Sequence, residues 1–393
     1  MARLWSSGFE LNSTTSGVEA SVFSAITVST TLARSGNYGI EQASDNATHF
    51  VDYQFSSATA KGPFYGRAYY HFIANGSGTT QIMTFDNSAT PTTDVVSIEI
   101  NSNGTLQLRD EDGAIGSPSA AISTGTWFYL ELMIDTTAAA GSHVVTARLN
   151  GATFATSSTR NLSVDVNHFY VGSDIDSNTI ATSGGYYIDD VAINDATGSF
   201  QNSWPGEGEI IHLLPDGAGD AANWTGAFTD VDEVTPDDAT TVIESTTLDQ
   251  VEEVTLAATP AALASDDTIN CVQVGVRFRA DGAAEPSFVL RIKAASAGTV
   301  EESANITPTT TTWSTNAIAV PINYALTLYD LPGASTTAWA KADLDTAQIG
   351  VRISADATDN IEVSTLWLLV DHKPAAAVPG NVTRGNLLLL GVG

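Results

Sequence analysis

The sequence has one cysteine, few lysines and no long hydrophobic run. Cys271 cannot form a disulfide within the chain, and no cysteine and histidine cluster has the spacing of a zinc site. Only four of the 15 basic residues are lysines, against 45 acidic residues, and the formal charge of -30 opposes binding to nucleic acid or anionic membranes. No stretch has the pattern of a signal peptide or the length to cross a bilayer. We therefore expect neither a nucleic-acid partner nor membrane insertion.

Most of the chain consists of short segments in which apolar and polar residues alternate. Examples are "FYGRAYYHFIA", "WFYLELMID" and "VVTARLN", and turn signals such as "NGSG", "DEDG" and "LNG" separate them. A period of two with many Val, Ile, Thr, Tyr and Phe residues is typical of half-buried strands. The pattern predicts an all-β chain made of two antiparallel β-sandwich, jelly-roll-like domains in tandem.

Proline and glycine punctuate the pattern once, in "GSFQNSWPGEGE". We place a domain boundary there, which gives a first domain over residues 1–204 and a second over residues 205–374. Residues 375–393 form a C-terminal tail that ends in the apolar patch Leu387 to Leu390. This patch is expected either to add as a strand to a neighbouring chain or to pack on its own domain.

Two family resemblances suggest a biological setting. The first region resembles the concanavalin A-like, or laminin-G-like, jelly roll in its opening "GFE", its run "TGTWFYLELMID" with the hairpin "VVTARLNGATF", and its closing "GGYYIDDVAIND". The second region resembles a β-sandwich of tailed-bacteriophage structural proteins, in which "LLPDGAGDAANWT", "VGVRFRA" and "TAWAKADLDTAQIGVR" recur in this order. Together they imply a virion protein, assembled in the host cytoplasm with other capsid or tail proteins as a homo-oligomer such as a trimer.

One set of carboxylates suggests catalytic groups. The concanavalin-like fold houses glycoside hydrolases that carry Glu-x-Asp-x-Glu on one strand, and the two catalytic acids flank the scissile bond. The nearest match here is Glu131 with Asp135, but Met133 replaces the acid between them. We expect Glu131 to face solvent and Asp135 to close its strand into a turn. The sequence therefore predicts no catalytic residue and a chain that is not an enzyme.

A second set of carboxylates suggests a metal site. Asp189 and Asp190 are adjacent, so in a regular strand they point to opposite faces and cannot converge on one bond. Laminin-G-like domains bind calcium at a loop rim through hard oxygen ligands. On that resemblance the candidate ligands for Ca²⁺ are Asp174, Asp176, Asp189 and Asp190, and the alternative is that they are solvated turn residues.

Aromatic side chains are the candidate glycan contacts: Tyr65, Tyr69 and Trp127 in the first domain and Trp224 in the second. Strand aromatics also fill cores, which is the competing interpretation. The leading hypothesis is a non-enzymatic phage virion component, a head decoration, a fibre or a tail-associated protein, that adheres to host-surface glycans. The alternative is a secreted protein that binds or cleaves carbohydrate.

Overall fold

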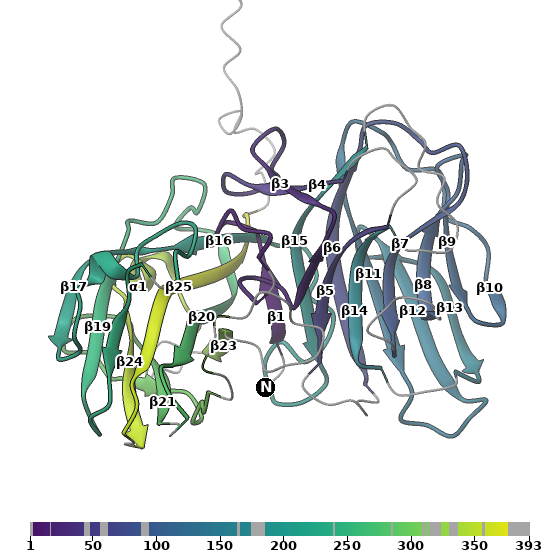
Figure 1. Cartoon of the computed structure of the whole chain (residues 1–393). Helices are drawn as coiled ribbons and strands as arrows, with labels where there is room; N and C mark the ends of the chain where they lie inside the picture. The colour runs from purple at the N-terminus through teal and green to yellow at the C-terminus, as the bar shows by residue number, and fades with distance from the viewer. Residues whose placement is uncertain are drawn as a thin grey trace, which may run out of the picture.

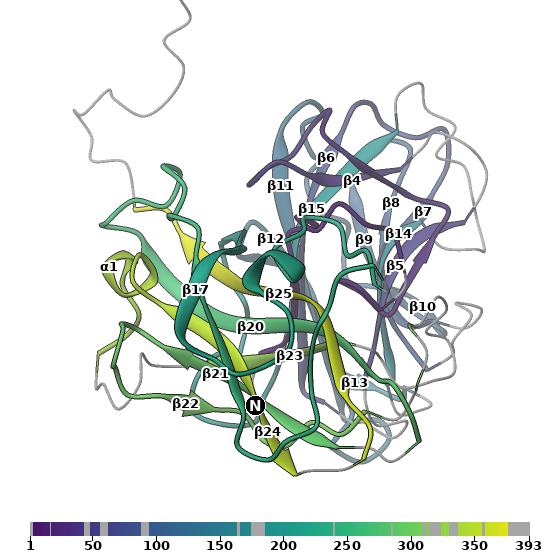
Figure 2. The same cartoon turned by 60° about the vertical axis from the view of Figure 1, so that its left-hand side comes forward.

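The computed structural model confirms the all-β fold, with two antiparallel β-sandwiches in tandem (Figures 1 and 2). It describes residues 3–15, 17–42, 48–55, 62–87, 94–162, 166–173, 185–238, 240–283, 286–308, 311, 313, 324–329, 337–355 and 358–375. The predicted C-terminal tail lies outside these residues, except for its first residue. In the described ranges no helix is long and apolar enough to span a membrane.

The first sandwich packs an eight-stranded sheet on a seven-stranded one. The eight-stranded sheet runs in the order β13 (Ala152–Arg160), β12 (His143–Leu149), β11 (Trp127–Asp135), β6 (Phe64–Phe72), β15 (Tyr186–Asp195), β4 (Gly39–Gln42) and β3 (Thr27–Ser29), with β1 (Arg3–Ser7) also paired to β15. The seven-stranded sheet runs β10 (Gly113–Ile115), β9 (Leu106–Asp110), β8 (Asp94–Ile100), β7 (Thr80–Asp86), β14 (His168–Ser173), β5 (His49–Gln54) and β2 (Val22–Ser24).

The second sandwich is built from two five-stranded sheets. One contains β16 (Glu209–Leu213), β25 (Ile361–Lys373), β20 (Thr268–Ala280) and β23 (Tyr324–Tyr329), with β18 (Ile243–Ser245) paired to β25. The other runs β17 (Pro215–Ala222), β19 (Val251–Leu256), β24 (Gln348–Ala355), β21 (Ser287–Lys293) and β22 (Glu301–Glu302). Helical turns occur at η1 (Phe228–Asp230) and α1 (Lys341–Leu344).

Each sandwich has its own hydrophobic core. The first core draws residues from Trp5 to Ile193, and the second from Ile211 to Val370. The predicted division after residue 204 falls in the segment between β15 and β16. Cys271 is buried in β20, as its place in an alternating strand predicts.

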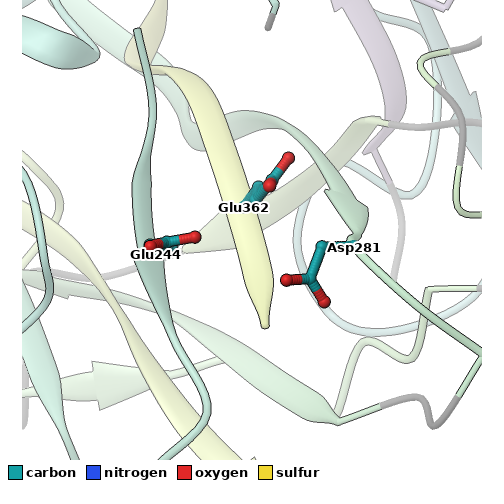
Figure 3. Close-up of side chains that lie close together, drawn as sticks. All are labelled: Glu244, Asp281 and Glu362. Atoms are coloured by element: carbon teal, nitrogen blue, oxygen red, sulfur yellow. The ribbon is translucent and has the colours of Figure 1, made fainter. Parts of the chain in front are cut away.

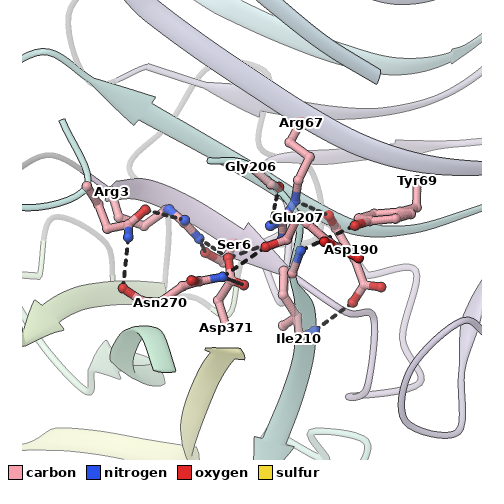
Figure 4. A network of polar contacts seen from close by, with 12 residues as sticks. Arg3, Ser6, Arg67, Tyr69, Asp190, Gly206, Glu207, Ile210, Asn270 and Asp371 are labelled. Atoms are coloured by element: carbon pink, nitrogen blue, oxygen red, sulfur yellow. Dashed lines mark hydrogen bonds and ion pairs between the residues drawn. The ribbon is translucent and has the colours of Figure 1, made fainter. Parts of the chain in front are cut away.

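The two sandwiches are joined by an apolar cluster and by a polar network. The cluster consists of Leu11, Val18, Ile210, Trp367 and Leu369, with residues from both sandwiches. In the network, the buried carboxylate of Asp371 accepts hydrogen bonds from side chains of both halves (Figure 4). Buried polar groups are stable only when their hydrogen bonds are satisfied, so this network fixes how the halves meet.

Candidate functional site

The eight-stranded sheet turns one face toward the core and the other, here called the outer face, away from it. Along β6 the alternation places Ala68 and Tyr70 in the core and Tyr65, Tyr69 and His71 on the outer face. Directly opposite residues of neighbouring antiparallel strands share a face, so the register orders the outer side chains into rows.

One such row is aromatic and lies where β6 ends and β11 begins. Trp127 of β11 pairs with His71 of β6, and His71 pairs with Tyr187 of β15. The ring centroids of His71 and Trp127 are 5.4 Å apart, and those of His71 and Tyr187 are 6.3 Å apart. We call Trp127, His71 and Tyr187 the aromatic row. Beside it the isoleucine that follows β6, Ile73, is 43% exposed.

The aromatic row also carries polar groups. The Nδ1 atom of His71 is buried and has no hydrogen-bond partner in the described part of the chain. The hydroxyl of Tyr187 is hydrogen-bonded to Glu41 of β4, and burial together with this carboxylate raises the pKa of Tyr187, so the phenol keeps its proton at neutral pH. A buried nitrogen without a partner is unusual, because burial removes its bonds to water. A bound ligand with hydroxyl groups would satisfy it.

The next row along the strands is partly covered. Tyr129 and Tyr69 lie opposite each other, with ring centroids 5.1 Å apart. Tyr69 is buried: the guanidinium carbon of Arg34 lies 3.5 Å from its ring centroid, and the backbone N–H of Gly208 donates to its hydroxyl at 3.2 Å. Tyr129 is half-buried and borders the aromatic row.

The far end of the outer face is covered by residues 196–208, the interdomain linker. The ring of Trp204 lies 5.2 Å from that of Tyr65 and 3.7 Å from the guanidinium carbon of Arg148. The N–H of Gly206 donates to Glu131 at 2.8 Å, and its carbonyl accepts from Arg67 at 3.1 Å.

The linker corrects one sequence expectation and leaves another intact. Glu131 is 1% exposed rather than solvent-facing, because the linker lies over it, and burial raises its pKa. Asp135 does close its strand into a turn, since its Oδ1 accepts the N–H of Thr137 at 2.9 Å. The two carboxylates therefore do not form a catalytic pair.

Asp189 and Asp190 lie on the same face, contrary to the expectation from regular alternation. The register between β15 and β6 shifts between Asp189 and Ala192, and Asp190 has a φ of 50°. This β-bulge repeats one facing position, so that Ile188 and Val191 both point into the core while the two acids between them point out. Both acids are fully buried, and burial with the neighbouring carboxylate raises the pKa of Asp189.

The protein itself supplies donors to this acid pair. Asp189 accepts the backbone N–H groups of Arg34 and Asp190, each at 2.8 Å. Asp190 accepts Nη1 of Arg34 at 2.5 Å, the Ser35 hydroxyl at 2.7 Å and the N–H of Ile210 at 2.6 Å. All four carboxylate oxygens are satisfied in this way, so the pair needs no cation. The other two predicted calcium ligands, Asp174 and Asp176, lie outside the described residues.

A different group of acids lies together in the second sandwich. Carboxylate oxygens of Glu244, Asp281 and Glu362 all lie within 4.8 Å of one another (Figure 3). Arg279 donates to Glu362 at 2.5 Å, and the side-chain amide of Asn360 donates to both other acids at 3.0 Å. These donors account for the cluster without an ion. The three acids lie far apart along the chain, in no motif that would indicate a shared site.

The four predicted glycan contacts lie in different environments. Trp127 belongs to the aromatic row, Tyr65 is half-buried beside Trp204, and Tyr69 is buried below Arg34. Trp224 is corrected: it packs in the second core, and its indole N–H donates to the backbone carbonyl of Gln250, so it is a core aromatic. His71 was not among the predicted contacts, although its even spacing from Tyr65 and Tyr69 in the sequence places it on their face.

No family model matches the chain, and no curated protein matches it. Solved structures match parts of it. A sialidase of Trypanosoma rangeli is 11% identical over 43% of this chain and 26% of its own, with a TM-score of 0.32. Cellulose induced protein Cip1 is 18% identical over 48% and 95%, with a TM-score of 0.34. Alginate lyase Aly36B is 16% identical over 40% and 81%, with a TM-score of 0.31. The chain thus spans about a quarter of the sialidase.

The titles of these neighbours bear on the prediction that the chain is not an enzyme. The sialidase and the lyase are enzymes, which contradicts the prediction that the chain is not one. None of the titles names a phage or virion protein. The expected virion partners, trimeric assembly and virion location therefore stay predictions from sequence resemblance.

Proposed function

We propose that the aromatic row of the outer face binds a saccharide. The observation that supports this is the alignment of Trp127, His71 and Tyr187 across three adjacent strands, with the buried Nδ1 of His71 left without a partner. Sugar rings stack on aromatic faces through their C–H groups, while their hydroxyls need hydrogen-bond partners at the same site. Trp127 is half-buried and offers a ring, and the buried Nδ1 of His71 beside it offers a hydrogen-bond acceptor, while Tyr187 is buried. The exposed Ile73 extends the apolar border of the row.

The test is a glycan array followed by calorimetric titration of each saccharide that binds. Trp127→Ala removes the half-buried ring at the edge of the row, and we expect it to weaken binding by about tenfold, or about 1.4 kcal/mol. Met133→Ala is the matched control, because it lies on the same strand and face with similar exposure. Equal affinities of the two variants would contradict the proposal.

Cleavage of the bound saccharide is a second candidate, favoured by the pairing of His71 with Tyr187. General acid–base catalysis needs a proton acceptor and a proton donor within reach of one bond. The unpartnered Nδ1 of His71 is suited to accept a proton, and the protonated hydroxyl of Tyr187, held by Glu41, is suited to donate one.

Cleavage would be followed as new reducing ends in a panel of polysaccharides. His71→Ala and Tyr187→Phe should each abolish product formation. Tyr187→Phe keeps all three rings of the row and should retain saccharide binding, whereas His71→Ala also removes a binding group, so its activity is compared at a saccharide concentration that saturates the variant. Product formation that survives in both variants would place the reaction elsewhere or in a contaminant. Binding without any product would leave a binding protein.

A further inference from the structure

The charged groups of the outer face restrict the saccharide that the aromatic row can accept. Arg3, Arg34, Arg67 and Arg148 are the arginines that reach this face in the described chain, and each lies near a carboxylate. Nη1 of Arg34 lies 2.5 Å from Asp190, and its Nη2 lies 3.7 Å from Glu209. These contacts, together with the stacking on Tyr69, hold the guanidinium of Arg34 in place.

Arg3 and Arg67 share one carboxylate of the second sandwich, whereas Arg148 has a longer ion-pair contact. Arg67 is fully buried, and its Nη2 lies 3.1 Å from Asp371 of the second sandwich. Arg148 stacks on the ring of Trp204 and lies 3.9 Å from Glu131. Recognition of an anionic sugar needs a guanidinium that is free to form a paired contact with the carboxylate. Arg3, Arg34 and Arg67 are already engaged. Arg148, whose Nε has no hydrogen-bond partner among the described residues, lies at the linker end of the outer face and not beside the aromatic row.

The charge next to the aromatic row is negative. Glu41 lies beside Tyr187 and accepts the hydroxyl of Ser29 at 2.8 Å. The whole chain carries a formal charge of -30, so an approaching anion meets repulsion at long range as well.

The groups left to meet a ligand are uncharged or hydrogen-bonding: the rings of Trp127 and Tyr129, the Nδ1 of His71 and the hydroxyl of Tyr187. We infer that the outer face selects an uncharged saccharide over a uronate, sialylated or sulfated one. This inference rests on the proposed function of the aromatic row and names its ligand class. A hydroxyl group satisfies the buried nitrogen, whereas a carboxylate would lie beside Glu41, where the described residues place no free cation.

The experiment compares matched oligosaccharides that differ only in a hydroxymethyl or carboxylate group at C6: manno- with mannurono-, gluco- with glucurono-, and galacto- with galacturono-oligosaccharides. Affinity for each is measured by calorimetry with the full chain. In each pair that binds, we expect the neutral oligosaccharide to bind at least about tenfold more tightly than the uronate, since like charges in a site are unfavourable. Glu41→Gln should reduce the ratio of the affinity for the neutral oligosaccharide to that for the uronate, and raised salt should reduce this ratio further.

Failure of this inference and failure of the proposed function are distinguishable. A uronate that binds as tightly as its neutral counterpart, and is lost in Trp127→Ala, overturns the ligand class but keeps the saccharide site. Binding of either kind that Trp127→Ala leaves unchanged overturns the aromatic row as the site. If neither the pairs nor a glycan array shows binding, both the proposed function and the ligand class fall.

Discussion

Arg3 and Asp371 lie 368 positions apart in the sequence and form an ion pair between the two sandwiches, with 2.7 Å between Nη1 of Arg3 and Oδ2 of Asp371. Neither side chain is exposed, and Nη2 of Arg67 lies 3.1 Å from the same oxygen. Burial alone would raise the pKa of Asp371, but the two guanidiniums outweigh it and hold this pKa below its usual value. Two arginines of the first sandwich thus share one carboxylate of the second (Figure 4).

Replacing this carboxylate should destabilise the chain strongly. Asp371→Asn leaves Arg3 and Arg67 buried without a counter-charge, and we expect the free energy of unfolding to fall by about 3–5 kcal/mol. Arg3→Met should cost less, because Arg67 still faces the carboxylate. Urea unfolding measures both, with Lys373→Met as the control, since the pair of Lys373 with Glu207 is half exposed. If Asp371→Asn lowers the free energy of unfolding no more than this control does, the role of the network is contradicted.

The same interface predicts that the two sandwiches stay together after the chain is cut. Residues Thr197–Ser199 of the linker are exposed, so a protease site can be inserted there. The apolar cluster with Trp367 and the buried pair of Arg3 with Asp371 remain after cleavage. We expect the two halves to co-elute in gel filtration under native conditions and to separate in denaturant. Native separation would show that the linker, rather than the interface, holds them.

The fold was predictable because its signal is local. Alternation with a period of two marks strands such as β6 and β11 directly in the sequence, and the all-β prediction is confirmed. The position of Asp189 and Asp190 was predicted wrongly, because alternation assumes a regular strand and the bulge at Asp190 reverses it. No residue near them signals that irregularity.

The site was predictable only in part, for reasons that differ between residues. Trp127 was identified as a candidate contact, but Glu131 was expected in solvent because the covering Gly206 lies 75 positions away in the chain. Trp224 could not be told from a core aromatic without the packing of the second sandwich. His71 could have been predicted, since the spacing of "FYGRAYYHF" places it on the face of Tyr65 and Tyr69.

The stability of the chain should fall as the pH rises from 4.5 to about 8, because of Glu19. This side chain is 2% exposed, and burial raises its pKa from 4.5 to about 8, although the N–H of Leu11 and the hydroxyl of Ser7 oppose the shift. In that window the unfolded chain has lost a proton that the folded chain keeps, so rising pH favours unfolding. Glu10, whose pKa burial raises to about 7, acts in the same direction.

Glu19→Gln should flatten this fall, which urea unfolding at a series of pH values measures. The exposed Glu111→Gln is the control and should leave the slope unchanged. His212, whose Nε2 lies 3.6 Å from Glu19, has the opposite effect on stability at acid pH. Burial lowers its pKa from 6.5 to about 3, so stability is lost as the pH falls through that range. A slope that survives in Glu19→Gln would assign the pH dependence to other groups.

Trp204 should stabilise the linker through Arg148 without taking part in saccharide binding. Its ring lies 3.7 Å from the guanidinium carbon of Arg148, and a double-mutant cycle of Trp204→Ala with Arg148→Ala should give a coupling of about 0.5–2 kcal/mol. The aromatic row lies at the opposite end of β11, so Trp204→Ala should leave saccharide affinity within about twofold of the wild type, whereas Trp127→Ala weakens it about tenfold.

The reverse result would move the site. If Trp204→Ala changed saccharide affinity more than Trp127→Ala does, the ligand would contact the part of the outer face that the linker covers, beside Tyr65 and Glu131. The unfolding measurement separates this case from simple loss of structure. A variant that keeps its cooperative transition but binds differently has altered the site, because binding then changes without a change in the population of folded protein.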